Sequence, residues 1–198
     1  MYELAIIGAG GFAREVKQWA LMSQATGLFP ITFYVSDEYA KPPIRPLSQL
    51  DPDRSMAVVA IGDPNARAKV VQGLRHGQRF TTVIHKTAIN QSGTNDGLIM
   101  CPFSVITTDC TIGKHVHLNL HSDIGHDCII GDYVTLSPSA RVSGKCNIGN
   151  RVYIGSNAVI REGVSICDDV TIGAGSVVLR NITEAGTYVG VPAKRLDK

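Results

Sequence analysis

The stretch IGHDCIIGDYVTLSPSARVSGKCNIGNRVYI, residues 124–154, carries a strict six-residue repeat. Its aliphatic anchors fall at every sixth position, and the same register runs from Ile106 to Val178 without a break. All thirteen positions of that series are branched aliphatic residues, whereas average composition supplies them at roughly one position in four or five. The stretch is therefore a true repeat, and its period decides the fold before any secondary structure is assigned.

A period of six residues predicts short strands joined by corners. Each anchor and the small or medium residue four positions later would face inward, with Gly, Asn, Asp and Ser at corners that need positive φ or tight bends. Three hexads make one triangular coil of 18 residues, and the coils stack as parallel strands of a β-helix, whose hexapeptide form is left-handed. Cys110, Cys128 and Cys146, spaced 18 apart, should form a column inside this prism. Because the prism buries its flat faces poorly alone, we expect self-association as a homotrimer.

Composition and charge narrow the class of protein. The chain has 198 residues, with 19 Lys and Arg against 17 Asp and Glu and a net charge of +2. This balance excludes the basic footprint of a nucleic-acid-binding protein. No apolar run reaches the ~18–20 residues of a membrane span and no export signal is visible, so we expect a cytoplasmic protein without a membrane partner. The five cysteines include no CxxC pair, and they predict neither disulfides nor a metal site.

Residues 1–84 show alternating strands and helices. Strands are expected at residues 3–7, 31–35, 56–61 and 80–84, and helices through residues 13–20 and 66–74. This order predicts a small Rossmann-like α/β domain with a parallel sheet. The turn that contains Gly10 and Gly11 could bring a phosphate to the backbone at the positive end of the helix dipole. Asp37 could accept hydrogen bonds from a ribose or a base. The segment is short for a dinucleotide, so a mononucleotide or nucleotide-sugar fits better, and a tight turn with only a docking function is the alternative.

Five motifs together carry a resemblance to a known family. They are GAGGFAREV at 8–16, IGDPNAR at 61–67, VIHKTA at 83–88, IGHDCIIGD at 124–132 and GVPAK at 190–194. With them the chain resembles the NeuD/PglD-type sugar O- and N-acyltransferases over nearly its whole length. The resemblance implies a nucleotide-sugar-binding domain at residues 1–84. It also implies a left-handed β-helix acyltransferase domain with a C-terminal tail at residues 85–198.

The resemblance also implies a mechanism. A histidine at the position of His126 acts as general base, and the acidic residue after it, here Asp127, raises its basicity. Gly144, one coil further on, would hold the thioester carbonyl through its backbone N–H. The donor would be acetyl-CoA, with no metal, and the acceptor a hydroxyl or amine of a nucleotide-linked sugar in surface polysaccharide or glycan biosynthesis.

The remaining site residues follow from the same resemblance. The acetyl-CoA would lie in the groove between subunits of the homotrimer, against Thr135, Gly144, Ser156, Ala174 and Lys194. The acceptor would be held by the N-terminal turns and by one histidine of the prism: Gly10, Gly11, Phe12, Asp37, Gly62 and His121.

Two departures from the family pattern stand out. N-acetylating relatives carry a histidine where this chain has Phe12, and another near the CoA thiol where it has Thr135. Residues 90–98 also break the hexad pattern and predict an irregular first coil. His115 and His117 are interpreted as exposed corner or strand-edge residues without a role.

Two other classes of function stay open. His85, His121 and His126 are separated by 36 and 5 residues, intervals that resemble the zinc-binding histidines of γ-class carbonic anhydrases. Two coils span roughly 10 Å at ~4.8 Å per strand, too far for His85 and His121 to share a zinc within one subunit. The irregular stretch after His85 should also spoil its register. The third class is a non-catalytic nucleotide-sugar-binding protein.

Overall fold

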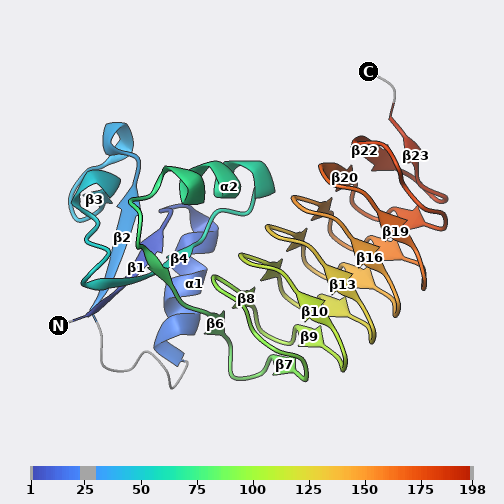
Figure 1. Cartoon of the computed structure of the whole chain (residues 1–198), viewed down its shortest axis with the longest axis horizontal. Helices are drawn as coiled ribbons and strands as arrows, with labels where there is room; N and C mark the ends of the chain where they lie inside the picture. The colour runs from blue at the N-terminus through green and yellow to red at the C-terminus, as the bar shows by residue number, and fades with distance from the viewer. Residues whose placement is uncertain (1, 23–29, 197–198) are drawn as a thin grey trace.

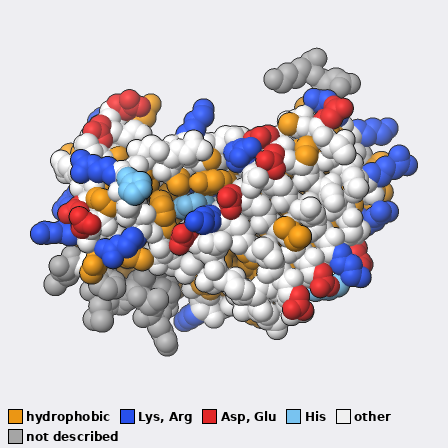
Figure 2. All heavy atoms as spheres, viewed as in Figure 1, with side chains coloured by type: hydrophobic (Ala, Val, Ile, Leu, Met, Phe, Trp, Pro, Cys, Tyr) orange, Lys and Arg blue, Asp and Glu red, His pale blue; other side chains and the backbone are white. Residues whose placement is uncertain are grey.

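The computed structural model describes residues 2–22 and 30–196. Figure 1 shows an α/β part in blue and cyan beside a prism of stacked coils coloured from green to red. Among the described residues no helix is long and apolar enough to cross a membrane. On the face in Figure 2, acidic and basic side chains are intermixed over both parts, as the small net charge predicts.

The N-terminal part is a five-stranded sheet in which every pair of neighbours is parallel, in the order β3-β2-β1-β4-β5. The strands are β1 (Glu3–Ile7), β2 (Ile31–Val35), β3 (Arg45–Pro46), β4 (Ser55–Val59) and β5 (Arg79–Phe80). The helices are α1 (Gly11–Met22) and α2 (Pro64–Gly73), with short 3₁₀ turns at Asp37–Tyr39 and Leu47–Gln49. This arrangement confirms the predicted Rossmann-like α/β domain.

The two helices cover opposite faces of this sheet because successive strand residues point to opposite sides. Leu4 and Ile6 pack in a cluster with Val16 and Trp19 of α1. The alternate strand residues Ala5, Ile7 and Val59 pack on the other face. They form a second cluster there with Val70 and Val71 of α2 and with Leu74 directly after it. The expected strand at residues 80–84 is instead two strands in two different sheets. Phe80 pairs with β4, whereas β6 (Val83–Ile84) already belongs to the prism.

The prism has three parallel sheets, and this confirms the predicted β-helix. Sheet I contains β6, β8 (Ile99–Met100), β11 (His117–Leu118), β14 (Thr135–Leu136), β17 (Tyr153–Ile154), β20 (Val170–Ile172), β22 (Gly186–Val189) and the antiparallel β23 (Lys194–Arg195). Sheet II contains β7 (Ile89–Asn90), β9 (Val105–Ile106), β12 (Asp123–Ile124), β15 (Arg141–Val142), β18 (Val159–Ile160) and β21 (Val177–Val178). Sheet III contains β10 (Thr111–Ile112), β13 (Ile129–Ile130), β16 (Asn147–Ile148) and β19 (Ser165–Ile166).

Three columns of corner residues join the sheets. The corner residues adopt positive φ at every sixth position from Gly97 to Gly175, including many non-glycine residues such as Asp127 at 58°. Corner I–II contains residues 103, 121, 139, 157 and 175. Corner II–III contains residues 109, 127, 145 and 163. Corner III–I contains residues 97, 115, 133, 151 and 169.

The glycines that follow the anchors serve a different purpose from the one expected. They do not have positive φ; instead, neighbouring coils approach too closely for a side chain. A Cβ on Gly113 would lie 2.5 Å from the carbonyl carbon of Gly131, and one on Gly155 would lie 2.7 Å from the nitrogen of Ala174. These glycines therefore permit stacking of the coils.

The core of the prism consists of the anchors and the inward residues four positions after them, as the period predicts. Cys128 and Cys146 are buried in it and Cys110 is half-buried. The backbone N–H of Cys146 lies 3.4 Å from Cys128 Sγ, which confirms the stacked column.

The first coil is irregular, as expected. Val83 pairs with Ile99, 16 residues later, whereas Ile99 pairs with His117, 18 residues later. Because of this shift, His85 is aligned with Cys101 and not with the column of His121. Cys101 in turn follows the strand that pairs with the next coil, where its N–H donates to the Leu118 carbonyl.

Candidate acyl-transfer site

The functional site is built first around His126 at corner II–III. Its Nδ1 lies 2.7 Å from Asp127 Oδ2, and both side chains are about half exposed, at 51% and 53%. A carboxylate only accepts hydrogen bonds, so Nδ1 carries the hydrogen and donates a hydrogen bond to Asp127. Nε2 has no hydrogen-bond partner among the described residues. The imidazole is therefore oriented by one nitrogen and open to solvent at the other.

Gly144 lies directly against this imidazole, one coil further along the prism. A Cβ on Gly144 would lie 2.8 Å from both Cε1 and Nε2 of His126. The backbone of this turn is fixed, because Lys145 N–H donates to the His126 carbonyl at 2.8 Å and Gly163 N–H donates to the Gly144 carbonyl at 3.0 Å. Only glycine leaves room for the ring at this position.

The backbone N–H of Gly144 is left uncapped. At the equivalent position of corner III–I, each N–H is capped by a side chain of the next coil. Lys114 N–H donates to Asp132, Asp132 N–H to Asn150, and Asn150 N–H to Asp168, at 2.7 to 2.8 Å. Gly144 N–H has no such partner among the described residues. It is therefore an available donor beside the histidine.

Gly125 completes this arrangement, and the sequence reasoning did not include it in the site. A Cβ on Gly125 would lie 2.6 Å from the nitrogen of Gly144. Because position 125 is glycine, the Gly144 nitrogen is not covered by a side chain from the coil before it. The signal was present in the sequence, as a glycine directly before His126 and 19 residues before Gly144.

A second region lies at the carboxyl ends of β1 and β4. The chain leaves these adjacent strands toward helices on opposite faces, and α/β sheets bind ligands in the crevice expected at such a point. The predicted substrate residues Gly10, Gly11 and Gly62 all lie here and are exposed. Gly10 and Gly62 have open space where a Cβ would be. Phe12 follows, half-buried, with its ring 5.5 Å from that of His117.

Asp37 lies after β2 on the same edge of the sheet. It is exposed, and its Oδ1 accepts the N–H of Ser48 at 3.0 Å. Hydrogen bonding by the Ser48 side chain, and then by its backbone N–H, lowers the pKa of Asp37. A shallow cavity of about 500 Å³ extends from Asp37 past Arg45 and Gln49. Asp37 thus fixes a loop beside the crevice with one oxygen.

The other expected prism residues lie away from His126 within one chain. Ser156 and Ala174 precede the corner I–II residues 157 and 175, at the opposite edge of sheet II. His121 belongs to the same corner, where its ring stacks on Phe103 at 5.1 Å. The structure does not bring these residues to the His126 imidazole of the same chain.

Thr135 lies in the contact between the two parts of the chain. Its side chain is only 4% exposed. The hydroxyl accepts from Arg67 Nη2 at 2.9 Å and donates to the Gly62 carbonyl at 2.9 Å. Its hydrogen-bonding groups are therefore used within the chain, and its expected place beside the acetyl-CoA stays a prediction.

The expectation that His115 and His117 are exposed is wrong, because both are buried at 2% exposure. The His115 ring stacks on Tyr133 at 5.2 Å and meets Phe80 edge-on. Burial, together with nearby Arg67, lowers the pKa of His115 to about 4 and the pKa of His117 well below its usual value. The α/β part covers the outer face of sheet I here.

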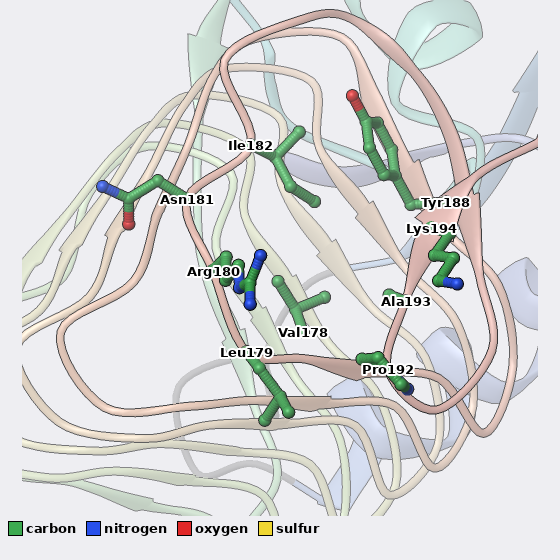
Figure 3. A pocket seen from close by; sticks show the side chains of 9 residues that line it. All are labelled: Val178, Leu179, Arg180, Asn181, Ile182, Tyr188, Pro192, Ala193 and Lys194. Carbon is green, nitrogen blue, oxygen red and sulfur yellow. The ribbon is translucent and has the colours of Figure 1, made fainter.

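Lys194 lies at the far end of the prism. It lines a cavity of about 310 Å³ together with Val178, Leu179, Arg180, Asn181, Ile182, Tyr188, Pro192 and Ala193. Figure 3 shows Val178 and Ile182 pointing into this hollow, with Tyr188 and Lys194 on its other side. The neighbouring Arg195 is paired with Glu184. The cavity thus combines an apolar floor with two cationic side chains.

In the described part of the chain, no group of three or more His, Cys, Asp and Glu side chains is arranged to hold a metal ion. His85, aligned with Cys101 by the shifted first coil, is hydrogen-bonded to Thr87 through Nδ1 at 2.9 Å. The three histidines of the zinc alternative are therefore not gathered within one subunit.

Comparisons with known proteins agree with this architecture. The PglD N-terminal domain family matches residues 3–74, and the bacterial transferase hexapeptide (six repeats) family matches residues 145–180. No curated protein sequence matches the chain.

Several solved structures match over the full length. WeeI from Acinetobacter baumannii AYE is 28% identical, with 99% of this chain and 100% of that chain covered and a TM-score of 0.87. PerB from Caulobacter crescentus, solved with CoA and GDP-perosamine, is 28% identical, with 100% and 98% covered and a TM-score of 0.87. The acetyltransferase domain of PglB from Neisseria gonorrhoeae FA1090 is 25% identical, with 99% and 100% covered and a TM-score of 0.84.

A left-handed hexapeptide β-helix with an uncapped glycine N–H beside an oriented histidine defines an acyltransferase of the hexapeptide-repeat class. The α/β domain that precedes it narrows the class further. The chain resembles the NeuD/PglD-type sugar acyltransferases, as its motifs predict, through the PglD N-terminal domain match at residues 3–74 and the full-length likeness to solved sugar acetyltransferases.

Proposed function

We propose that this protein transfers the acetyl group of acetyl-CoA to a hydroxyl or amine of a nucleotide-linked sugar. The observation that carries the proposal is the contact between the His126–Asp127 pair and Gly144, whose N–H has no partner. A base and an oxyanion donor side by side on an exposed corner are what direct acyl transfer needs. This base and this donor need no metal ion for acyl transfer, so they give no reason to favour the zinc hydratase alternative.

The reaction runs in one addition and one elimination. His126 Nε2 takes the proton of the acceptor's O–H or N–H as that atom attacks the thioester carbonyl carbon. The electron pair of the carbonyl moves to its oxygen, where Gly144 N–H stabilises the charge. Collapse of this intermediate breaks the C–S bond, and the leaving CoA thiolate receives the proton from the imidazolium. Asp127 holds the ring in the required tautomer throughout.

The acetyl-CoA arm would lie along corner II–III. Arg180 lies between β21 and Ile182, which pairs with Ile166, so it is at the same corner about three coils after His126, or roughly 14 Å away at ~4.8 Å per coil. With Lys194 it lines the cavity at the end of the prism. The two cations are suited to the phosphates of CoA, whose pantetheine arm would extend back to Gly144. The structures of PerB with CoA and of the PglB domain with acetyl-CoA support this donor.

A homotrimer would complete the site. Ser156 and Ala174 belong to corner I–II, whereas His126 belongs to corner II–III. Both sets can line one groove only if corner I–II of one subunit lies beside corner II–III of another. We therefore place the site between subunits of a cytoplasmic homotrimer.

The acceptor would bind in the crevice at the carboxyl ends of β1 and β4. Exposed Gly10 directly precedes α1 and exposed Gly11 begins it, where a phosphate can approach the backbone. Asp37 and Gly62 border the same edge of the sheet. GDP-perosamine in complex with PerB supports a nucleotide-sugar as the acceptor class, in surface polysaccharide or glycan biosynthesis.

The test is thiol release from acetyl-CoA in the presence of a panel of amino-sugar and hydroxyl-sugar nucleotides that includes GDP-perosamine. His126→Ala should abolish transfer, and Asp127→Asn should reduce kcat by ~10–100-fold, with oligomeric state unchanged by light scattering. Turnover retained by His126→Ala would refute the base assignment. Binding of the nucleotide-sugar without any acetyl-CoA turnover by the wild type would instead favour the non-catalytic alternative.

A further inference from the structure

Arg67 is the largest fully buried side chain in the described structure, at 0% exposure. It lies in α2, yet it forms no ion pair with any described carboxylate. A buried guanidinium without a counter-ion is costly unless every donor is satisfied. Its role must therefore be sought in its hydrogen bonds.

On one side, the guanidinium holds the end of β4. Nη1 donates to the carbonyl of Ile61 at 2.6 Å and to the carbonyl of Gly62 at 3.2 Å. These two residues form the β4 edge of the crevice assigned to the acceptor.

On the other side, the guanidinium holds the prism. Nε donates to the carbonyl of His115 at 3.0 Å, and Nη2 donates to the carbonyl of Tyr133 at 2.7 Å and to Thr135 Oγ1 at 2.9 Å. The coil between His115 and Tyr133 is the one that carries His126. With the two bonds to Ile61 and Gly62 in the turn after β4, all five N–H donors of the guanidinium are used.

We propose that Arg67 is a positioning residue that fixes the acceptor crevice on the coil that carries the general base. The inference rests on the proposed function for the identity of the crevice, but the clamp itself is a separate claim. Lysine has three donors from one nitrogen and cannot reach both sides in the same way. Thr135 adds a second link, since its hydroxyl donates to the Gly62 carbonyl.

The primary experiment is amide hydrogen exchange on the wild type, Arg67→Met, Arg67→Lys and Thr135→Val. Exchange at Ala60, whose N–H donates to the Ile7 carbonyl at 2.8 Å directly before the clamped residues, should be faster in all three variants by about tenfold or more, because the clamp no longer opposes local opening there. Thr135→Val keeps the shape of the side chain and covers the case in which Arg67→Met does not fold. Lys69→Met, an exposed residue of the same helix, is the matched control and should leave exchange unchanged.

Steady-state kinetics separate positioning from simple loss of stability. In Arg67→Lys and Thr135→Val, KM for the acceptor should rise by about three- to tenfold while KM for acetyl-CoA stays within about twofold. A purely structural role would lower the active fraction, and hence kcat, with both KM values unchanged, and this outcome would overturn the proposal. Unchanged exchange at Ala60 would also overturn it. If no acceptor supports turnover, the proposed function fails, while the exchange data still decide whether Arg67 holds Gly62.

Discussion

Replacing Gly144 with alanine would place a methyl group where the His126 imidazole now lies. The added carbon would be 2.8 Å from Cε1 and Nε2 and 3.1 Å from Cδ2, whereas carbon atoms pack at about 3.5–4.0 Å. The ring must therefore retreat by about 0.7 Å or more. That movement stretches or breaks the 2.7 Å hydrogen bond to Asp127. The backbone N–H that would hold the oxyanion is kept.

A displacement of this size should lower kcat/KM by ~10²-fold, equivalent to about 2.7 kcal/mol in the transition state. Stability should change by less than about 1 kcal/mol, because the half-exposed imidazole can swing into solvent. The assay is thiol release from acetyl-CoA with the best acceptor, alongside thermal unfolding. Gly93→Ala, where a Cβ meets nothing within 4 Å, is the control and should retain full activity. Wild-type kcat/KM in Gly144→Ala would refute the geometry of the site.

Two further predictions concern pH and assembly. The pKa of His115 falls from 6.5 to about 4 on folding. Between these two pH values the unfolded chain therefore binds more protons than the folded chain. The free energy of unfolding should decrease by on the order of 3 kcal/mol as the pH drops through this window. His115→Phe should have a smaller pH dependence of its urea midpoint, and an unchanged slope would contradict the shift. For assembly, the inactive His126→Ala variant is mixed with an Ala174→Trp variant that blocks the groove. If each site is shared between two subunits, mixed trimers contain some intact sites and should regain activity. Neither variant alone should be active. Absence of recovery in verified mixed trimers would place the whole site within one chain.

The prism could be predicted almost residue by residue because its period is exact. Each inward side chain is specified by its position in the hexad, and residues 18 apart must stack once the coils are regular. For this reason the contact of His126 with Gly144 followed from the spacing and the resemblance together. The sheet of the N-terminal part was equally accessible, since Leu4 to Ile7 form an unbroken apolar run flanked by a glycine-rich turn.

The covered outer face of sheet I could not be predicted in the same way. A hexad assigns a residue to the inside or the outside of the prism, but it does not say which outer face another part of the chain covers. His115, His117 and Thr135 were therefore expected to be accessible. One local signal existed: Ile99 is an apolar residue at an outward position, and it packs in one cluster with Trp19 of α1.

The contrast between two corners explains how one repeat provides both stability and chemistry. At corner III–I the carboxylate or amide of each coil caps an N–H of the coil before it, and Arg151 pairs with Asp169 along the same edge. Such capped corners satisfy the backbone and leave nothing for a substrate. At corner II–III the side chain one coil after Gly144 is Glu162, and its carboxylate pairs with Lys145 and does not cap the Gly144 N–H. Gly144 is buried beside the imidazole, and its unpartnered N–H is a donor that a thioester carbonyl can satisfy. A side chain at position 144 would take the space of the imidazole and move the base away from this donor, so the glycine is required for the two groups to lie side by side.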